Sequence, residues 1–132
     1  MSYSVDLEGD CLQCKTEEAA HHAAVLINAD TWMHHHLKVV PVERSVPQEG
    51  RVWFLEINEF DGCGWNIDAS DAVWLAIAPH MADGANLEFR GEAADRWRIR
   101  WQAARVFTDN VKEVIWTVNE EITAPAQKED AP

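Results

Sequence analysis

The chain has 132 residues, of which 23 are acidic and 11 basic, giving a formal net charge of −12. This length indicates one domain. A domain of this size buries roughly two-thirds of the surface that its unfolded chain exposes, so its core needs no disulfide or metal for stability. An apolar fraction of 47% excludes a disordered protein. The negative charge disfavours direct binding of nucleic acid or of an anionic membrane, and it favours a protein partner with a basic surface.

The expected cellular compartment is inferred from the absence of targeting and membrane segments in the sequence and from its cysteines. No apolar run reaches the roughly 18 residues that suggest a transmembrane helix. The N-terminus lacks the basic segment and apolar core of a signal peptide. Three cysteines without a secretory signal indicate a reducing environment. These features predict a cytoplasmic protein.

The first third of the chain predicts a strand, a loop and a helix. Residues 3–8 alternate apolar and polar side chains, as a half-buried strand does. Residues 9–15 are expected to form a loop. Thr16 is placed to cap a helix that has acidic residues in its first turn and ends near residues 28–30.

The middle of the chain predicts two strands and a second helix. Residues 37–44 favour a strand, and Pro41 restricts it to a sheet edge or a bulge. Residues 51–60 carry aromatic side chains on both faces, which is typical of a central strand. Asp68 or Ser70 is then expected to cap a helix, and Pro79 to shorten its last turn.

Residues 86–101 predict a β-hairpin. Apolar and charged side chains alternate on both sides of a short polar link. Cross-strand partners must share a face, so parity pairs Phe89 with Trp97. It also places Leu87 opposite Ile99 and Glu88 opposite Arg98. One face is then apolar and the other carries arginines.

The last segments complete the predicted fold. Residues 103–110 suggest a turn or short strand, and residues 112–118 a further strand. We expect a single globular domain over residues 1–120 and a disordered acidic tail over residues 121–132. The order β-α-β-β-α-β-β-β predicts an α+β domain with a mainly antiparallel sheet and two helices packed on one face.

One candidate metal site lies near the N-terminus. Cys11 and Cys14 form a CxxC pair, and His21 and His22 follow within reach of a zinc ion. A histidine of residues 34–36, or Cys63, could complete the ligand set. A single CxxC is a weak signal, and ordinary, partly buried cysteines are the favoured interpretation. Apart from this zinc alternative, no cofactor is expected.

The arginines of the predicted hairpin are the most informative polar residues. Arg90, Arg96, Arg98 and Arg100 should share one sheet face, where guanidinium groups could clamp a phosphate or a carboxylate. The alternative is that strand acids such as Glu56, Glu88 or Glu113 neutralise them in an exposed lattice of ion pairs. Because acids outnumber bases, the lattice is favoured.

Seven tryptophans offer a choice between core and interface. The strand and helix patterns place five of them inward, and these are Trp53, Trp74, Trp97, Trp101 and Trp116. Trp32 and Trp65 fall in predicted loops. An exposed loop tryptophan is a better interface candidate than an inward one.

Together these features predict a small, acidic, intracellular, non-enzymatic module that binds a protein with a basic surface. Its extreme form is an inhibitor that mimics nucleic acid, as some phage-encoded proteins do. The expected partner-binding residues are Trp32, Trp65, Glu17, Glu18 and Asp61. The alternatives are zinc binding and a small-anion domain or enzyme that uses the arginines. The oligomeric state is left open, with a homodimer among the alternatives.

An enzyme is the less favoured interpretation. The chain contains neither a P-loop nor a G-x-G-x-x-G motif, and no G-x-S-x-G elbow. Glu56, Glu59 and Asp61 lie near one strand end, but no nucleophile or base can be placed beside them from the sequence.

Overall fold

The computed structural model describes residues 4–31, 33–65, 70–93 and 95–111. Its elements, in chain order, are β1 (Val5–Cys11), β2 (Gln13–Cys14), α1 (Glu17–Ala29), the 3₁₀ turn η1 (Met33–His35), β3 (Leu37–Val46), β4 (Gly50–Phe60), α2 (Asp71–Ile77), the 3₁₀ turn η3 (Ala78–His80), β5 (Asn86–Gly91), β6 (Arg96–Gln102) and β7 (Arg105–Val111). The predicted α+β class is confirmed in a single small domain.

The strands form two antiparallel sheets, so the prediction of one sheet is wrong. One sheet has the order β1-β5-β6-β7 and the other the order β2-β4-β3. Only Leu12 separates β1 from β2, and its carbonyl accepts a hydrogen bond from Leu55 at 2.9 Å. The chain therefore changes sheets at one buried residue. Most of the loop predicted over residues 9–15 is in fact strand.

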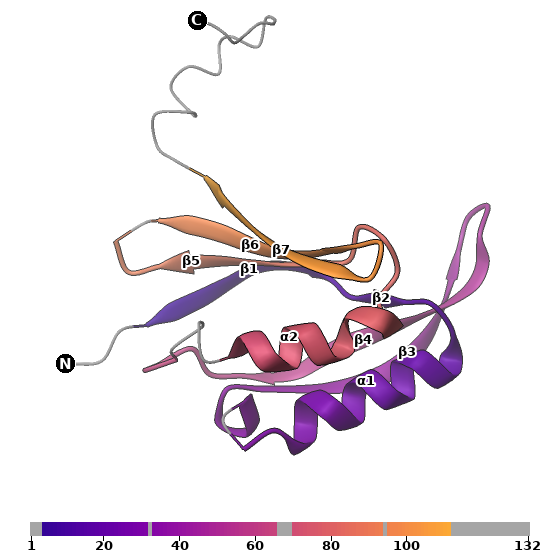
Figure 1. The fold of residues 1–132 in the computed structure, drawn as a ribbon, viewed down its shortest axis with the longest axis horizontal. Helices are drawn as coiled ribbons and strands as arrows, with labels where there is room; N and C mark the ends of the chain where they lie inside the picture. The colour runs from indigo at the N-terminus through magenta and orange to yellow at the C-terminus, as the bar shows by residue number, and fades with distance from the viewer. Residues whose placement is uncertain (1–3, 32, 66–69, 94, 112–132) are drawn as a thin grey trace, which may run out of the picture.

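The four-stranded sheet forms one layer, and both helices lie beneath it with β3 and β4 (Figure 1). The Thr16 hydroxyl accepts a hydrogen bond from the Ala19 amide at 3.0 Å, which confirms the predicted N-cap. Four alanines and Ile27 form the buried face of α1. These small side chains allow the helix to approach its neighbours closely.

The second helix is short for the reason expected. Pro79 lies in η3, which tightens the chain after α2 has ended at Ile77. Ser70 occupies the N-cap position, but its side chain makes no capping hydrogen bond. Its hydroxyl accepts instead from the Trp65 indole at 3.0 Å. Asp68, the other predicted cap, lies outside the described residues.

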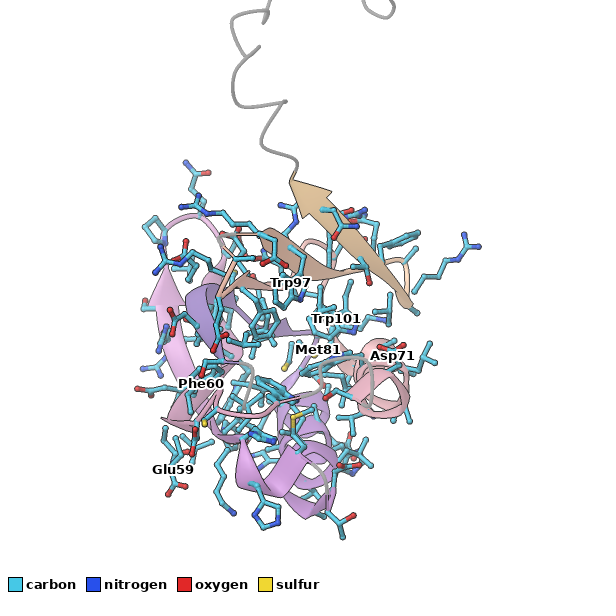
Figure 2. The ribbon with its side chains drawn as sticks, turned by 90° about the vertical axis from the view of Figure 1, so that its left-hand side faces the viewer. Glu59, Phe60, Asp71, Met81, Trp97 and Trp101 are labelled. Carbon is cyan, nitrogen blue, oxygen red and sulfur yellow. The ribbon has the colours of Figure 1, made fainter. Side chains whose placement is uncertain are left out.

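The predicted hairpin is confirmed with its register. β5 pairs with β6 so that Phe89 lies opposite Trp97, and Leu87 opposite Ile99. Trp101 and Trp74 are buried, while Trp97 and Trp53 are partly buried and pack against the core. In Figure 2, Trp97 and Trp101 lie beneath the four-stranded sheet, on the side of the helices.

The edge and centre of the smaller sheet are also as predicted. β3 is an edge strand that contains Pro41 and a register shift between Lys38 and Val39, and β4 is central. β7 is the short strand expected within residues 103–110. The strand predicted at 112–118, Trp116 and the predicted tail at 121–132 lie outside the described residues.

Candidate functional site

The outer face of the four-stranded sheet carries the arginines singled out by the sequence. We call this surface the arginine face and define it by Arg90, Arg96, Arg98 and Arg100. Alternation along β5 and β6 places these side chains opposite the apolar layer that covers the core. The flanking strands β1 and β7 then supply their neighbours.

The first pair of arginines is neutralised from β1. Glu8 lies 3.4 Å from the Arg90 guanidinium and 3.6 Å from that of Arg96. Asp6 lies 3.5 Å from Arg90. Two carboxylates thus face two guanidinium groups.

The second pair shares one carboxylate on β7. Asp109 accepts hydrogen bonds from Arg98 at 2.9 Å and from Arg100 at 2.8 Å and 3.2 Å. The hydrogen bond from Arg100 is the largest cause that lowers the pKa of Asp109; burial opposes it, and the hydrogen bond from Arg98 lowers the pKa further. The Arg100 guanidinium also lies over the Phe107 ring, 4.7 Å from its centroid. The Asp109 carboxylate therefore bridges the two positively charged guanidinium groups of Arg98 and Arg100.

The favoured interpretation of this face as an ion-pair lattice is confirmed, but the predicted acids are not the ones that form it. Glu56 lies on the other sheet, 3.9 Å from Arg44. Glu113 lies outside the described residues. The partners are instead Asp6, Glu8 and Asp109. They could not be found from the sequence, because the hairpin pattern does not reveal that β1 borders β5 and β7 borders β6.

A hollow of about 290 Å³ opens on the arginine face. The charged residues that line it are Glu8, Glu88, Arg96, Arg98 and Asp109. Gly9 lies opposite Glu88 in the ladder, next to a register shift in β1. A β-carbon added at Gly9 would lie 3.5 Å from a Glu88 carboxylate oxygen, so this carboxylate extends over the glycine. The absence of a side chain at Gly9 thus leaves space beside Glu88.

The candidate zinc ligands do not form one cluster. Cys11 is exposed, whereas Cys14 is buried with its sulfur 4.0 Å from that of Met81. Burial raises the pKa of the Cys14 thiol to about 12, which disfavours the thiolate that zinc requires. His21 contacts the Trp53 ring and His22 the His80 ring. Within the described part of the chain, no three histidine, cysteine or acidic side chains are grouped to hold a metal.

The prediction that Trp65 is an exposed loop residue is wrong. Trp65 is only 2% exposed. Its ring stacks on His36 at a centroid distance of 5.3 Å and meets the edge of Phe89 at 5.5 Å. It links the start of β3 to the four-stranded sheet and cannot anchor a partner. Trp32, the other expected anchor, lies outside the described residues.

The predicted acidic contacts are exposed but do not form one patch. Glu17 and Glu18 begin α1, whose 13 residues span about 20 Å. Asp61 follows β4, and its backbone N–H donates to the His36 carbonyl, beyond the other end of α1. These acids therefore lie toward opposite ends of α1, and one partner would have to extend along the helix to reach all three.

A second hollow, of about 280 Å³, lies where β3 begins and β4 ends. His36, Lys38, Glu59 and Asp61 are among its lining residues. The Nδ1 atom of His36 lies 2.7 Å from the Asp61 carbonyl oxygen. Glu59 and Asp61 thus share a hollow, as their proximity in sequence suggested, while Glu56 is paired elsewhere.

Comparison with protein-family models, with curated proteins and with solved structures gave no match. Among the described residues, no helix is long and apolar enough to span a membrane. The site must therefore be interpreted from its own geometry.

Proposed function

We propose that this protein is a non-enzymatic binding module whose acidic surface engages a basic surface on a partner protein. The observation that carries the proposal is the pairing of its arginines. Six of its seven arginines form ion pairs with carboxylates of the same chain. The arginine side chains are thus largely occupied, and the excess carboxylates set the electrostatic potential that an approaching partner meets.

The same pairing weakens the alternative of a small-anion site on the arginine face. An incoming phosphate would have to displace Glu8 or Asp109 from guanidinium groups that they already neutralise. A basic partner needs no such displacement. A nucleic-acid mimic, which would occupy the binding surface of a DNA- or RNA-handling protein, is the extreme form of this proposal.

Fluorescence anisotropy with a labelled nona-arginine peptide tests the proposal. We expect saturable binding at about 0.05 M NaCl and at least tenfold weaker binding at about 0.5 M, because salt screens charges beyond a few ångströms. A labelled DNA duplex should not bind. Absence of saturation at low salt, or an affinity indifferent to salt, would overturn the proposal.

A control experiment distinguishes binding by this particular surface from binding that depends on net charge alone. An unrelated acidic protein of matched size and net charge is titrated with the same peptide under the same conditions. We expect it to bind more weakly, since specific contacts require positioned groups as well as net charge. Equal affinities would show that nona-arginine detects only net charge and would remove the support for a dedicated surface.

A further inference from the structure

Glu88 differs from every other charged residue that lines the hollow on the arginine face. Its cross-strand neighbour on β6 is Arg98, but Arg98 turns to Asp109 on β7. On the β1 side its neighbour is Gly9, which has no side chain. Among the residues that the structure describes, the Glu88 side chain therefore has no hydrogen-bond or ion-pair partner.

The other four charged groups of the hollow are already engaged with one another or with neighbours. Glu8 faces Arg96 at 3.6 Å, and Asp109 faces Arg98 at 2.9 Å. Arg90 and Arg100 also contact Glu8 and Asp109 from outside the lining, so the four arginines of the face balance its four acids, Asp6, Glu8, Glu88 and Asp109. Glu88 is the acid of the lining to which the described residues offer no side-chain partner, and a cation bound there would supply one.

We propose that this hollow receives an arginine side chain from the basic partner, with its guanidinium group bound to the Glu88 carboxylate. The proposal rests on the proposed function and assigns a place on the surface to it. A guanidinium group matches a carboxylate with two parallel N–H donors and is more weakly hydrated than an ammonium group. A hollow of about 290 Å³ is large enough for one such side chain rather than for a folded element.

A matched pair of variants tests the site with nona-arginine as the probe. Glu88→Gln and Glu59→Gln each remove one exposed carboxylate and preserve side-chain shape. Glu59 lies on β4, away from the four-stranded sheet (Figure 2). At low salt we expect Glu88→Gln to weaken binding about tenfold or more, which corresponds to about 1.4 kcal/mol, and Glu59→Gln to weaken it less than about twofold.

Two further measurements sharpen the test. In ¹H–¹⁵N spectra of the full chain, nona-arginine should shift the amide signals of Gly9 and Glu88 more than that of Glu59. Nona-lysine should bind more weakly and depend less on Glu88, because an ammonium group cannot form the bidentate contact. Equal dependence of both peptides on Glu88 would overturn the assignment to guanidinium.

The outcomes separate this inference from the proposed function. Equal weakening by Glu88→Gln and Glu59→Gln would overturn the hollow as the arginine site and leave the acidic binding surface standing. Failure of nona-arginine to bind the unaltered protein would overturn both. Thermal unfolding of each variant checks the fold, and an unaltered melting temperature is expected because both side chains are exposed.

Discussion

The side chain of Asn28 on α1 satisfies both backbone polar groups of Val39 on the edge strand β3. Its amide nitrogen donates to the Val39 carbonyl at 2.8 Å, and its carbonyl accepts from the Val39 N–H at 2.9 Å. An exposed strand edge is a template for pairing with another chain. Two residues further on, Pro41 has no N–H to offer. The Asn28 side chain of α1 and Pro41 thus prevent part of the β3 edge from pairing with another strand.

Asn28→Ala should therefore destabilise the protein. Two hydrogen bonds are lost and the Val39 groups are left without protein partners, which costs about 1–3 kcal/mol, less a few tenths regained from the helix propensity of alanine. Chemical denaturation measures the difference. Val25→Ala on the exposed side of the same helix is the control and should change stability little. Equal effects of the two substitutions would contradict the role of Asn28.

Asp109→Asn should produce a loss of stability that depends on pH. Arg100 and Arg98 lower the pKa of Asp109 in the folded protein, so its carboxylate stabilises the fold above its unfolded-state pKa. That contribution is lost as the pH falls through the lowered folded-state pKa. The wild type should thus be more stable than the variant near neutral pH, and the two should converge in strong acid.

Thermal unfolding between neutral and strongly acidic pH measures this convergence. Asp95→Asn is the control, because the Asp95 side chain is exposed and forms no ion pair with a described residue. Its unfolding curve should follow that of the wild type at each pH. A constant difference between wild type and Asp109→Asn down to strong acid would contradict the ion-pair explanation.

The three cysteines should differ in reactivity. Cys11 and Cys63 are exposed, whereas Cys14 is buried and burial raises its thiol pKa to about 12. Only the thiolate reacts readily with a disulfide reagent. At pH 8 (about four units below that pKa) we expect two thiols to react quickly and the third only after unfolding. Cys14→Ser should leave the fast count at two, and a fall in that count would refute the assignment.

Substitution by alanine should destabilise the protein strongly at Gly62 and little at Gly9. A β-carbon at Gly62 would overlap the Val5 carbonyl, to which this segment is tied by a hydrogen bond from the Val5 N–H to the Gly62 carbonyl at 3.0 Å. Gly62→Ala must separate β1 from the end of β4, and we expect a loss of several kcal/mol. Gly9→Ala meets only ordinary contacts and should change stability by less than about 1 kcal/mol. Similar unfolding midpoints for both variants would contradict this arrangement.

Local patterns in the sequence predict the elements well. The hairpin register follows from parity together with the short link, because a slip of one residue would place Phe89 opposite an arginine. The Thr16 cap and the shortening at Pro79 are equally local, since each depends on the chemistry of a few adjacent residues.

Contacts between distant segments were not predictable in the same way. Trp65 lies in a short segment without periodicity, so nothing in its surroundings distinguished a buried ring from an exposed one. Its burial depends on His36 and Phe89, which are separated from it by 29 and 24 positions. β2 has two residues, too few for any repeating pattern, so the sequence did not indicate it as a strand. The second sheet could not be predicted because alternation does not reveal which strands pair with one another.

The sequence by itself determined the α+β class, the two helices, the hairpin and the charged character of its outer face. Only the tertiary structure decided which acids neutralise the arginines and which carboxylate is left over. Alternation fixes the face on which a side chain lies, because it depends on neighbouring residues. The strand that borders that face depends on how the whole chain packs. Glu88 lies opposite Arg98 and Gly9, and this packing leaves its side chain without a partner among the described residues.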